Sequence, residues 1–460
     1  MKYSFIYRLL AGLMILTSCS KFVDIVPSPQ LIISEDVFSD EQSALSALNG
    51  VYTQMRNSNL TFSNSGLTIF AALSADELIR SAPNVTYDVF YRNNIPANDP
   101  TINTFFWTAP YNILYRSNAI INGLSASTGI PADAVRRLSG EMKFIRAFTC
   151  FYLINLFGPV PLITTTDYTQ NATIPRTDTT LIWRQIVTDL EEAAAALEGT
   201  ATGAGTGKVR PGFFAVKALQ ARVHLYRKDW VAAERAASIV INTGPFEIEM
   251  DPERTFLINS TETIWEIASR NGTGNTGEAT NFIPLTTATV PAFQLTPSLQ
   301  AAFEMGDKRW QYWVGQGGSG TATYPYPRKY RNRNVQPVTE YNIVLRLAEL
   351  YLIRAEALAM LDETDNAVKD INVIRNRAGL EALPKDLSQQ HCLERIAQER
   401  RIELFAEWGH RWLDLKRTVA ADTVLGAEKT WWQPYASLYP IPLNQLLYNY
   451  YLKQNNGYEQ

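Results

Sequence analysis

Two segments of this chain repeat the same helix-turn-helix pattern, and this repetition constrains the fold more than any other feature. The first joins helical patterns over 210–226 and 230–241 through a tight turn, and the second joins 343–361 and 366–377. When the segments are aligned, Ala221, Ala233, Ala237 and Val240 match Ala355, Ala367, Ile371 and Ile374. Small residues at these places let two helices approach closely, so each segment is predicted to form a pair of packed helices.

Further helical patterns surround these two pairs. Apolar residues recur at helical spacing over 34–57, 111–124, 133–156, 181–197 and 389–408. Gly158-Pro159 is predicted to end the helix over 133–156. The two helix pairs resemble tetratricopeptide units, which stack into a helical repeat scaffold, although the full consensus of that repeat is absent.

Two stretches lack this periodicity. Residues 245–337 are rich in Gly, Thr, Pro and Asn, with a strand-like alternation over 263–268, and residues 418–460 are also irregular. The predicted fold is mostly α, a tetratricopeptide-like helical repeat scaffold packed against a loop-rich region with short strands. It is predicted as one domain over 35–460, with 35–244 and 338–417 mainly helical and 245–337 and 418–460 loop-rich.

The N-terminus has the form of a bacterial lipoprotein signal. A basic start precedes a short apolar run over 9–16, whereas a membrane span needs about 20 apolar residues. The run ends in Leu-Thr-Ser-Cys at Cys19, which resembles a lipobox, where the Cys is acylated and becomes the first mature residue. We expect a signal peptide over 1–18, lipidation at Cys19 and a lipidated tether over 19–34. A plain secretory signal with an incidental Cys stays open.

The composition narrows the classes of function. A hydrophobic fraction of 46% with 19% charged residues suits a soluble globular protein, and a net charge of −3 offers no basic surplus for nucleic acid. Aromatic residues reach 11%, and aromatic rings both fill cores and stack on sugars, so ligand binding becomes a hypothesis. Cys150 and Cys392 lie far apart in helical patterns and could be buried free thiols or a disulfide.

Several short motifs could indicate catalysis, a cofactor or a metal site, but the surrounding sequence lacks the pattern or spacing that each of these sites needs. Gly272-x-Gly274-x-x-Gly277 matches the dinucleotide fingerprint, but no helix pattern follows it. Three widely spaced histidines give no metal-ligand spacing, so neither metal nor cofactor is predicted. Asp76-Glu77 could serve a glycosidase, but a polar loop or helix start also explains the pair. No catalytic residue is predicted, and we do not expect an enzyme.

Motifs along the whole chain resemble those of the SusD/RagB family. They are Glu141 to Arg146-Ala followed by LFGPVPL over 156–162, RLAE over 346–349, RAEAL over 354–358, NVIRNRAGL over 372–380, IAQERRIEL over 396–404, YPIP over 439–442 and NNGY over 455–458. Trp408 departs from the usual small residue at its place, and Asn456 stands where Pro is common. The matches run in order from Cys19 to Tyr458 and cover nearly all of the expected mature chain.

The resemblance implies a mostly α-helical fold with four tetratricopeptide-like helix pairs and a loop-rich part that carries the ligand site. It implies a non-catalytic lipoprotein, held in the outer membrane by lipid at Cys19 and exposed at the cell surface. Such a protein captures nutrient, most often a glycan, for a SusC-like TonB-dependent transporter, and nucleic acid is not an expected partner. A binder of peptides or other non-glycan nutrients stays open, as does a lipid-anchored hydrolase.

Aromatic residues in non-repeat segments are the candidate ligand contacts. A sugar face packs on an aromatic ring while flanking polar groups bind the hydroxyls. The candidate rings are Tyr87, Tyr91, Trp313, Tyr324 and Tyr326, with Phe90, Arg92, Asn93 and Tyr330 beside them. Each ring could instead belong to the core or to a rigid turn.

The charged residues of the family motifs are expected to be architectural. Arg146, Glu349, Glu356, Arg400 and Glu403 are interpreted as buried or half-buried ion-pair positions rather than ligand contacts. Removing one partner of a buried pair is costly, about 3–5 kcal/mol.

Overall fold

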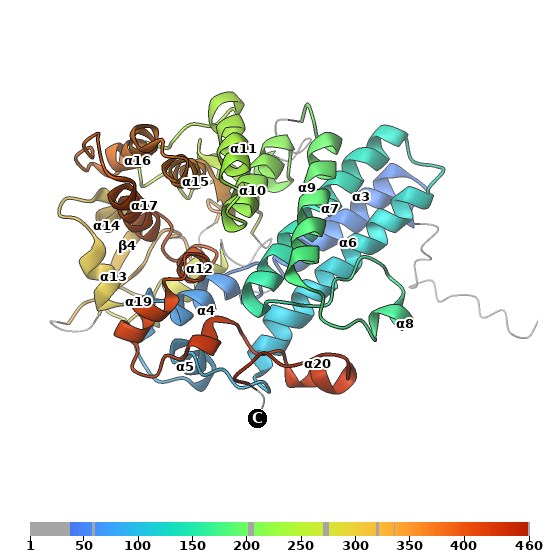
Figure 1. The fold of residues 1–460 in the computed structure, drawn as a ribbon, viewed down its shortest axis with the longest axis horizontal. Helices are drawn as coiled ribbons and strands as arrows, with labels where there is room; N and C mark the ends of the chain where they lie inside the picture. Colours follow the sequence, from blue (N-terminus) through green and yellow to red (C-terminus); the bar gives the residue numbers. More distant parts are fainter. Residues whose placement is uncertain are drawn as a thin grey trace, which may run out of the picture.

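The computed structural model describes residues 37–57, 60–200, 207–269, 276–318, 322–334 and 336–458. Within these ranges helices dominate, and the strands are few and short (Figure 1). The predicted signal peptide, the tether and Cys19 lie outside the described residues, as does most of the Gly272–Gly277 motif.

Long helices form the scaffold. They are α3 (Glu41–Met55), α6 (Ala109–Ala126), α7 (Ala132–Phe157), α9 (Thr179–Ala196), α10 (Phe213–Tyr226), α11 (Trp230–Thr243), α15 (Leu347–Met360), α16 (Thr364–Ala378) and α17 (Gln389–Glu403). The consecutive helices α6 and α7, α10 and α11, and α15 and α16 pack against each other, while α9 packs on α7 and α11 on α15. The prediction of a mostly α fold on repeated helix pairs is confirmed.

The α10–α11 pair shows how local sequence builds this unit. Ala221 on α10 and Ala233 and Ala237 on α11 are completely buried, which lets the two helices approach closely. Asp229 caps α11, since its side chain accepts a hydrogen bond from the backbone N–H of Ala232. Small residues and a capped turn therefore specify the pair, as the sequence predicts.

Shorter elements cover the scaffold. The helices are α4 (Gly66–Ser74), α5 (Val85–Tyr91), α8 (Tyr168–Asn171), α12 (Gly277–Phe282), α13 (Pro297–Ala302), α14 (Lys308–Trp313), α18 (His410–Arg417), α19 (Ala421–Glu428) and α20 (Leu443–Tyr448), with a π-helical segment η1 (Ile102–Thr108) and 3-10 turns η2 (Gly207–Val209) and η3 (Pro434–Ser437). The strands are β1 (Leu78–Arg80), β2 (Thr263–Ile267), β3 (Phe293–Leu295), β4 (Val314–Gly317), β5 (Tyr324–Pro327) and β6 (Asn342–Arg346).

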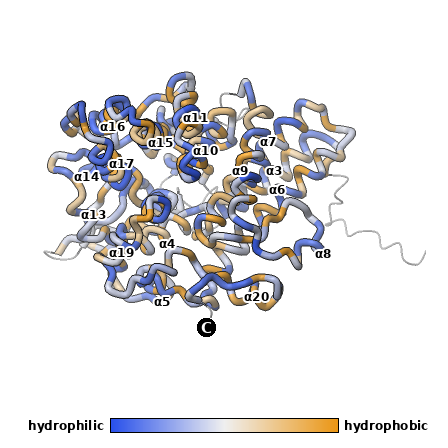
Figure 2. Tube along the Cα trace, in the orientation of Figure 1, coloured by the Kyte–Doolittle hydropathy of each residue, from blue (hydrophilic) through white to orange (hydrophobic). Residues whose placement is uncertain are grey.

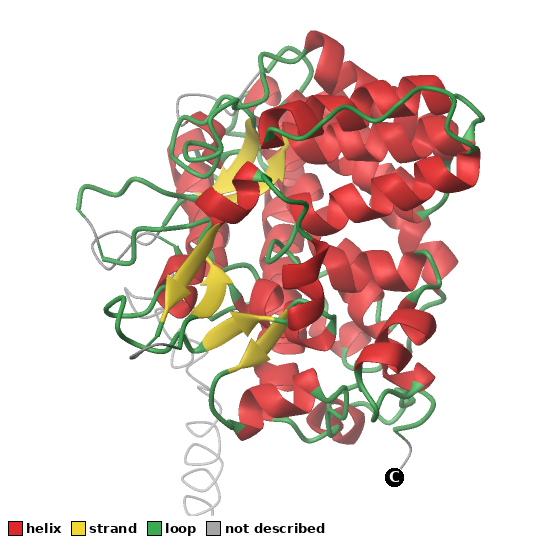
Figure 3. Cartoon of the chain, turned by 90° about the vertical axis from the view of Figure 1, so that its left-hand side faces the viewer, coloured by secondary structure: helices red, strands yellow, loops and turns green. Residues whose placement is uncertain are grey.

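Within the described ranges these strands form three antiparallel pairs, β1 with β3, β2 with β6 and β4 with β5. Figure 3 shows the strands gathered on one side of the molecule and the long helices on the other. The loop-rich region is thus a covering layer with short strands, as predicted.

Several predictions about helices are wrong. The helix predicted to begin at residue 34 is α3, which begins at Glu41, and α12 begins at Gly277, where no helix was predicted. Residues 343–346, predicted to begin a helix, belong to β6, which pairs with β2 and is buried along its whole length. A short apolar run looks alike in a buried strand and a buried helix, so periodicity alone could not separate them. The helix predicted over 389–408 ends at Glu403, because Ala406 and Trp408 adopt φ angles of 50° and 46°, which a right-handed helix excludes.

A buried ionic network joins the covering layer to the scaffold. Glu403 of α17 accepts hydrogen bonds from Arg309 of α14 at 3.1 Å, from Arg346 of β6 at 2.5 Å, and from Arg377 of α16. Arg346 also donates to Glu407 at 2.9 Å. Burial opposes the charge of Glu403, but Arg377, Arg346 and Arg309 together hold its pKa well below the usual range. One carboxylate thereby fixes three elements that are distant in sequence.

The other family-motif charges are paired in the same way. Arg146 binds Asp189 at 2.6 Å, Glu349 binds Arg222 at 2.6 Å, Glu356 binds Arg417 at 2.5 Å, and Arg400 binds Asp414 at 2.8 Å. Every residue in these pairs is buried or half-buried. The prediction that these residues form buried or half-buried ion pairs is confirmed.

The apolar core includes residues of the scaffold helices and of the shorter elements that cover them. Hydrophobic and hydrophilic residues alternate along the scaffold helices (Figure 2), and all nine residues of α4, a helix that the sequence did not predict, are buried. Cys150 and Cys392 are buried free thiols, which decides between the two alternatives left open for them. Among the described residues, no helix combines the length and apolar character of a membrane span.

Candidate functional site

Trp313, a predicted ligand contact, lies against the ionic network instead of facing outward. It ends α14, is 1% exposed, and donates its indole N–H to the carbonyl of Pro252 at 2.7 Å. The Lys329 ammonium and the Arg377 guanidinium lie 4.8 and 4.9 Å from its ring centroid. The protein's own cations therefore cover the ring, so it is not available to a ligand. Arg377 comes from a distant part of the chain, and its contact with the ring could not be predicted from the sequence.

Tyr326 is also buried, at 5% exposure, for a reason specific to its strand pair. It stands opposite Gly315 in the β4–β5 register, and a Cβ on Gly315 would lie 2.3 Å from the Tyr326 ring. The ring thus fills the space that the glycine leaves, as aromatic residues do across from glycine in sheets. Tyr324 on the same strand is half-buried, and Tyr330 is buried.

Tyr87 is half-buried on α5, and other side chains surround its ring. Asn84 caps this helix by accepting a hydrogen bond from the Thr86 N–H at 3.1 Å. The Tyr87 ring stacks on Phe70 with centroids 5.2 Å apart, and the Arg80 guanidinium lies 4.8 Å from its centroid. Phe293 makes a further edge contact with centroids 5.1 Å apart, so little of this ring is left for a ligand.

Tyr91, at the end of α5, also has a cation over its ring, the Lys429 ammonium 5.1 Å from the centroid, but it differs from the other rings in its contact with an exposed indole. It is half-buried and makes an edge contact with Trp431, with ring centroids 5.8 Å apart. Trp431 is 42% exposed. Burial, with a smaller contribution from Glu428, raises the pKa of Tyr91, so its hydroxyl stays protonated and can both donate and accept hydrogen bonds.

A buried lysine, Lys429, anchors the chain segment that carries Trp431. Lys429 is 3% exposed, and its ammonium donates to the carbonyls of Leu73 and Ser74 at 2.8 and 2.9 Å and to the side chain of Asn93 at 3.0 Å. It therefore ties the segment after α19 to α4 and to the residues after α5, and Figure 1 shows α5 and α19 as neighbours. Asn93, a predicted neighbour of the ligand, has this structural role.

Polar side chains lie on and just after the same helix as Tyr91, around a pocket that neither Tyr91 nor Trp431 lines. A shallow pocket of about 330 Å³ on α5 is lined by Pro83, Asn84, Val85, Asp88, Val89, Arg92 and Asn94. Asp88 precedes Tyr91 by three residues, so the two lie on the same side of the helix. We call Tyr91, Trp431, Asp88, Arg92 and Asn94 the α5 surface. It combines an exposed ring with carboxylate, guanidinium and amide groups, the combination that binds hydroxylated rings.

Sequence reasoning singled out Tyr91 and Arg92 but missed Trp431. The signal for it was the doublet Trp431-Trp432 in the loop-rich segment 418–460. Neighbouring side chains in a non-helical segment point in different directions, and here Trp432 is 8% exposed whereas Trp431 is 42% exposed. Two adjacent Trp residues in a loop therefore indicate that one is accessible.

The acidic pair Asp76-Glu77 lies in the core of the molecule. Both carboxylates are buried, and Asp76 accepts hydrogen bonds from Arg411 at 2.7 Å and from Arg401 at 2.8 Å. Burial and the neighbouring Asp76 raise the pKa of Glu77 to about 8. Across the described ranges, no group of three or more His, Cys, Asp or Glu side chains is placed to hold a metal ion.

Two family models match the chain. The model of the SusD family matches residues 314–458, and the model described as starch-binding associating with outer membrane matches residues 29–225. Together the two matches include most of the long helices and leave residues 226–313 unmatched.

Whole-chain relatives agree with these matches. A SusD-like protein from Formosa agariphila, P25, is 26% identical over 517 aligned positions, which cover 96% of this chain and 97% of the relative. A SusD superfamily structure from Bacteroides vulgatus superposes with a TM-score of 0.80 at 21% identity, covering 91% of this chain and 99% of that one. A laminarin-binding SusD-like protein gives a TM-score of 0.77 at 24% identity, covering 91% and 100%.

Proposed function

The chain belongs to the SusD/RagB family, and we propose that it binds a glycan at its α5 surface and delivers it to a SusC-like TonB-dependent transporter. The observation that carries the site is the Tyr91–Trp431 pair, in which an exposed indole stands beside a protonated phenol. The laminarin-binding relative and the starch-binding family model support a glycan as the ligand. Binding to an exposed ring beside polar side chains needs no catalytic group, which fits a role in capture.

A glycan panel tests this proposal. Laminarin, soluble starch and other polysaccharides would be titrated into purified protein by calorimetry, with unstructured peptides as the competing class of ligand. We expect at least one glycan to bind and no peptide to do so. Peptide binding without any glycan would favour the alternative of a non-glycan nutrient, and release of reducing ends during incubation would favour the lipid-anchored hydrolase.

We also propose that acylation of Cys19 anchors the protein in the outer membrane with the α5 surface exposed to the medium. In cells that express the protein without its transporter, wild type should partition into the membrane fraction, and Cys19→Ala should move to the soluble fraction. The physical reason is the loss of the acyl chains, because burying each CH₂ group contributes about 0.8 kcal/mol. Mass spectrometry of the N-terminal peptide gives the modification directly. Membrane retention of Cys19→Ala would contradict the proposal.

A further inference from the structure

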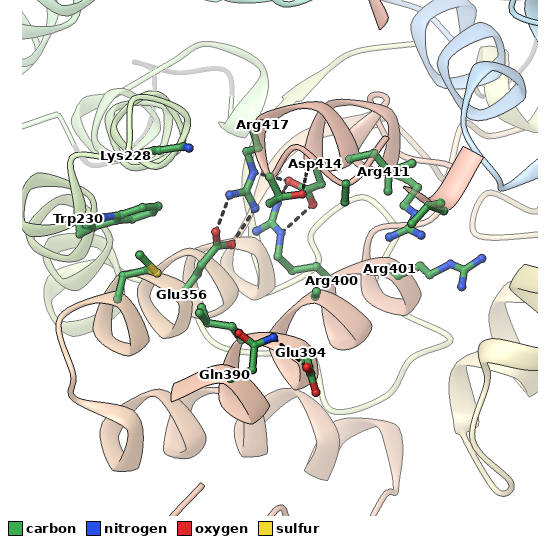
Figure 4. A pocket seen from close by; sticks show the side chains of 17 residues that line it. Lys228, Trp230, Glu356, Gln390, Glu394, Arg400, Arg401, Arg411, Asp414 and Arg417 are labelled. Carbon is green, nitrogen blue, oxygen red and sulfur yellow. Dashed lines mark hydrogen bonds and ion pairs between the residues drawn. The ribbon is translucent and has the colours of Figure 1, made fainter. Parts of the chain in front are cut away.

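A pocket of about 530 Å³ lies between α15, α17, α18 and α19, and charged side chains in its wall bind one another (Figure 4). The Arg417 guanidinium donates to Glu356 at 2.5 Å and to Asp414 at 2.7 Å, and Arg400 donates to Asp414 at 2.8 Å. These pairs tie α15, α17 and α18 together, so the charges of these four residues are used within the scaffold. A surface that the scaffold does not use lies at another place, on α20.

Helix α20 and the residues just after it expose several large side chains to solvent. We call the exposed residues the α20 surface: Leu443, Asn444, Leu447 and Tyr448 on the helix, and Tyr450 and Tyr451 after it. The four on the helix stand at positions i, i+1, i+4 and i+5, so they share one face. Tyr448 is 82% exposed and Tyr450 is 77% exposed. Apolar side chains gathered in this way mark interaction sites, because soluble proteins otherwise keep such patches small.

The two tyrosines after α20 are held in place although they are exposed. The rings of Tyr450 and Tyr451 lie against each other with centroids 4.1 Å apart, and the Tyr450 hydroxyl donates to the Tyr451 hydroxyl at 2.8 Å. The backbone N–H of Tyr451 donates to the side chain of Asn449 at 3.1 Å, and that side chain donates to the carbonyl of Ile174 at 2.8 Å. Leu452, the next residue, is buried. Rings that are fixed in advance lose little conformational freedom when a ligand binds.

The side chains of the α20 surface suit a neutral, hydroxylated ligand. Between Trp431 and Leu452 the sequence has no Asp, Glu, Lys, Arg or His, so this segment offers no charge to a ligand. Asn444 lies one turn before Tyr448 on the same helix face, which places an amide beside an aromatic ring. The Tyr451 hydroxyl accepts from Tyr450 and can still donate its own hydrogen. Aromatic rings beside amide and hydroxyl groups are the combination that binds sugars.

The α20 surface lies on the same chain segment as part of the α5 surface. Trp431 and the tyrosines of the α20 surface both follow α19 in the sequence. The backbone N–H of Leu443 donates to the carbonyl of Ala97 at 2.8 Å, and Gln445 donates to Asn103 at 3.0 Å, so α20 packs on the chain that follows α5. Figure 1 shows α5 and α20 along the same edge of the molecule. A polymer bound at one surface can therefore extend along this edge toward the other.

We propose that the α20 surface binds a neutral polysaccharide, and that one polysaccharide chain occupies it together with the α5 surface. This inference rests on the proposed function, because it adds a second contact for the same class of ligand. Sugar rings stack on Tyr448 and Tyr450, while Asn444 and Tyr451 bind hydroxyl groups. Once the first surface is occupied, binding at the second is intramolecular, so the two together hold a long chain more tightly than either alone.

The test compares a long and a short form of one glycan on the full mature protein. Laminarin with laminaritriose, or soluble starch with maltotriose, would be titrated by calorimetry, according to which polysaccharide the wild type binds. In the double variant Tyr448→Ala/Tyr450→Ala, the affinity for the polysaccharide should fall about tenfold, because two stacking rings are lost. The affinity for the trisaccharide at the α5 surface should stay the same, because a trisaccharide that fills this surface leaves no chain to reach the second.

Two further variants make this result specific. Tyr168→Ala removes a ring from α8 that is 81% exposed, as much as Tyr448, and should keep the wild-type affinity for both forms of the glycan. Tyr448→Phe keeps the ring and should keep most of the affinity for the polysaccharide, which separates stacking from the loss of a hydroxyl group. The substituted side chains are all exposed, so thermal melts of the variants should match that of wild type.

Equal affinities of wild type and the double variant for the polysaccharide would overturn this inference and leave the proposed function standing. If those affinities are equal but the double variant no longer co-purifies with the transporter, the α20 surface is a protein contact instead. An equal loss for trisaccharide and polysaccharide would also overturn it, because the substitutions would then act at the α5 surface. If wild type binds only acidic polysaccharides, this inference alone fails, and if it binds no glycan, the proposed function fails with it.

Discussion

Replacing Glu403 by Gln is expected to lower the free energy of unfolding by about 3–5 kcal/mol, the cost of removing one partner from a buried ionic cluster. Glu403 is completely buried and is shared by Arg309, Arg346 and Arg377. Without its charge, these guanidinium groups stay buried with one carboxylate fewer to neutralise them. The midpoint of guanidinium chloride denaturation, followed by tryptophan fluorescence, should fall markedly.

The matched control for this variant is Glu394→Gln on the same helix. Glu394 is exposed, and the structure gives it a hydrogen bond from Gln390 at 2.9 Å. Substitutions at such positions usually change stability by no more than about 0.5 kcal/mol, so the midpoint should stay close to that of wild type. Equal midpoints for Glu403→Gln and wild type would show that the network does not hold the covering layer to the scaffold.

A double-mutant cycle tests the coupling within the network. The losses in Glu403→Gln and Arg377→Met should not add, because the double variant no longer leaves Arg377 charged and short of a carboxylate. A coupling energy of about 1 kcal/mol or more would be expected for groups in one network. Simple additivity would indicate that Arg377 is stabilised mainly by its contact with Glu262 at 3.4 Å.

Replacing Trp431 by Ala is expected to weaken glycan binding about tenfold to hundredfold and to leave the melting temperature unchanged. A ring that stacks on a flat ligand contributes about 1–3 kcal/mol, by analogy with bases stacked on aromatic side chains, which corresponds to that loss of affinity. Trp431 is 42% exposed, so its removal leaves no large buried cavity. Calorimetric titration with the bound glycan and a thermal melt measure both quantities.

Two controls make this result specific. Trp432→Ala truncates the adjacent indole, which is 8% exposed and donates to Asp422 at 2.9 Å, so it should lower the melting temperature by several degrees. Tyr168→Ala removes an 81% exposed ring on α8 and should change neither affinity nor stability. If Trp431→Ala keeps full affinity, the glycan site lies elsewhere, and the half-buried Tyr324 becomes the next ring to test.

Local patterns were enough to predict the scaffold helices. The 133–156 pattern became α7, and the matching alanines of the two helix pairs are buried where the helices meet. The spacing of apolar residues shows which face of a helix is buried. All the residues that form this pattern lie on the same helix, so the pattern can be seen without knowing the rest of the fold. The same reasoning failed at 343–346, because strand pairing depends on a partner, β2, about 80 residues away in the chain.

The candidate site was only partly accessible to this reasoning. The sequence singled out aromatic rings outside the repeat helices, and Tyr91 remains a candidate for that reason. Exposure, however, is a property of the packed molecule: Trp313 is covered by Lys329 and Arg377, and Tyr326 by its place across from Gly315. No spacing in the sequence records these contacts.

The sequence by itself was enough to predict the mostly helical scaffold and the resemblance to the family, because both depend on residue types at short and regular spacing. Only the tertiary structure decided which rings stay exposed, that Glu403 unites three distant arginines, and that Trp431 stands beside Tyr91. These features arise from contacts between elements far apart in the chain, whose relative positions follow from packing the whole core.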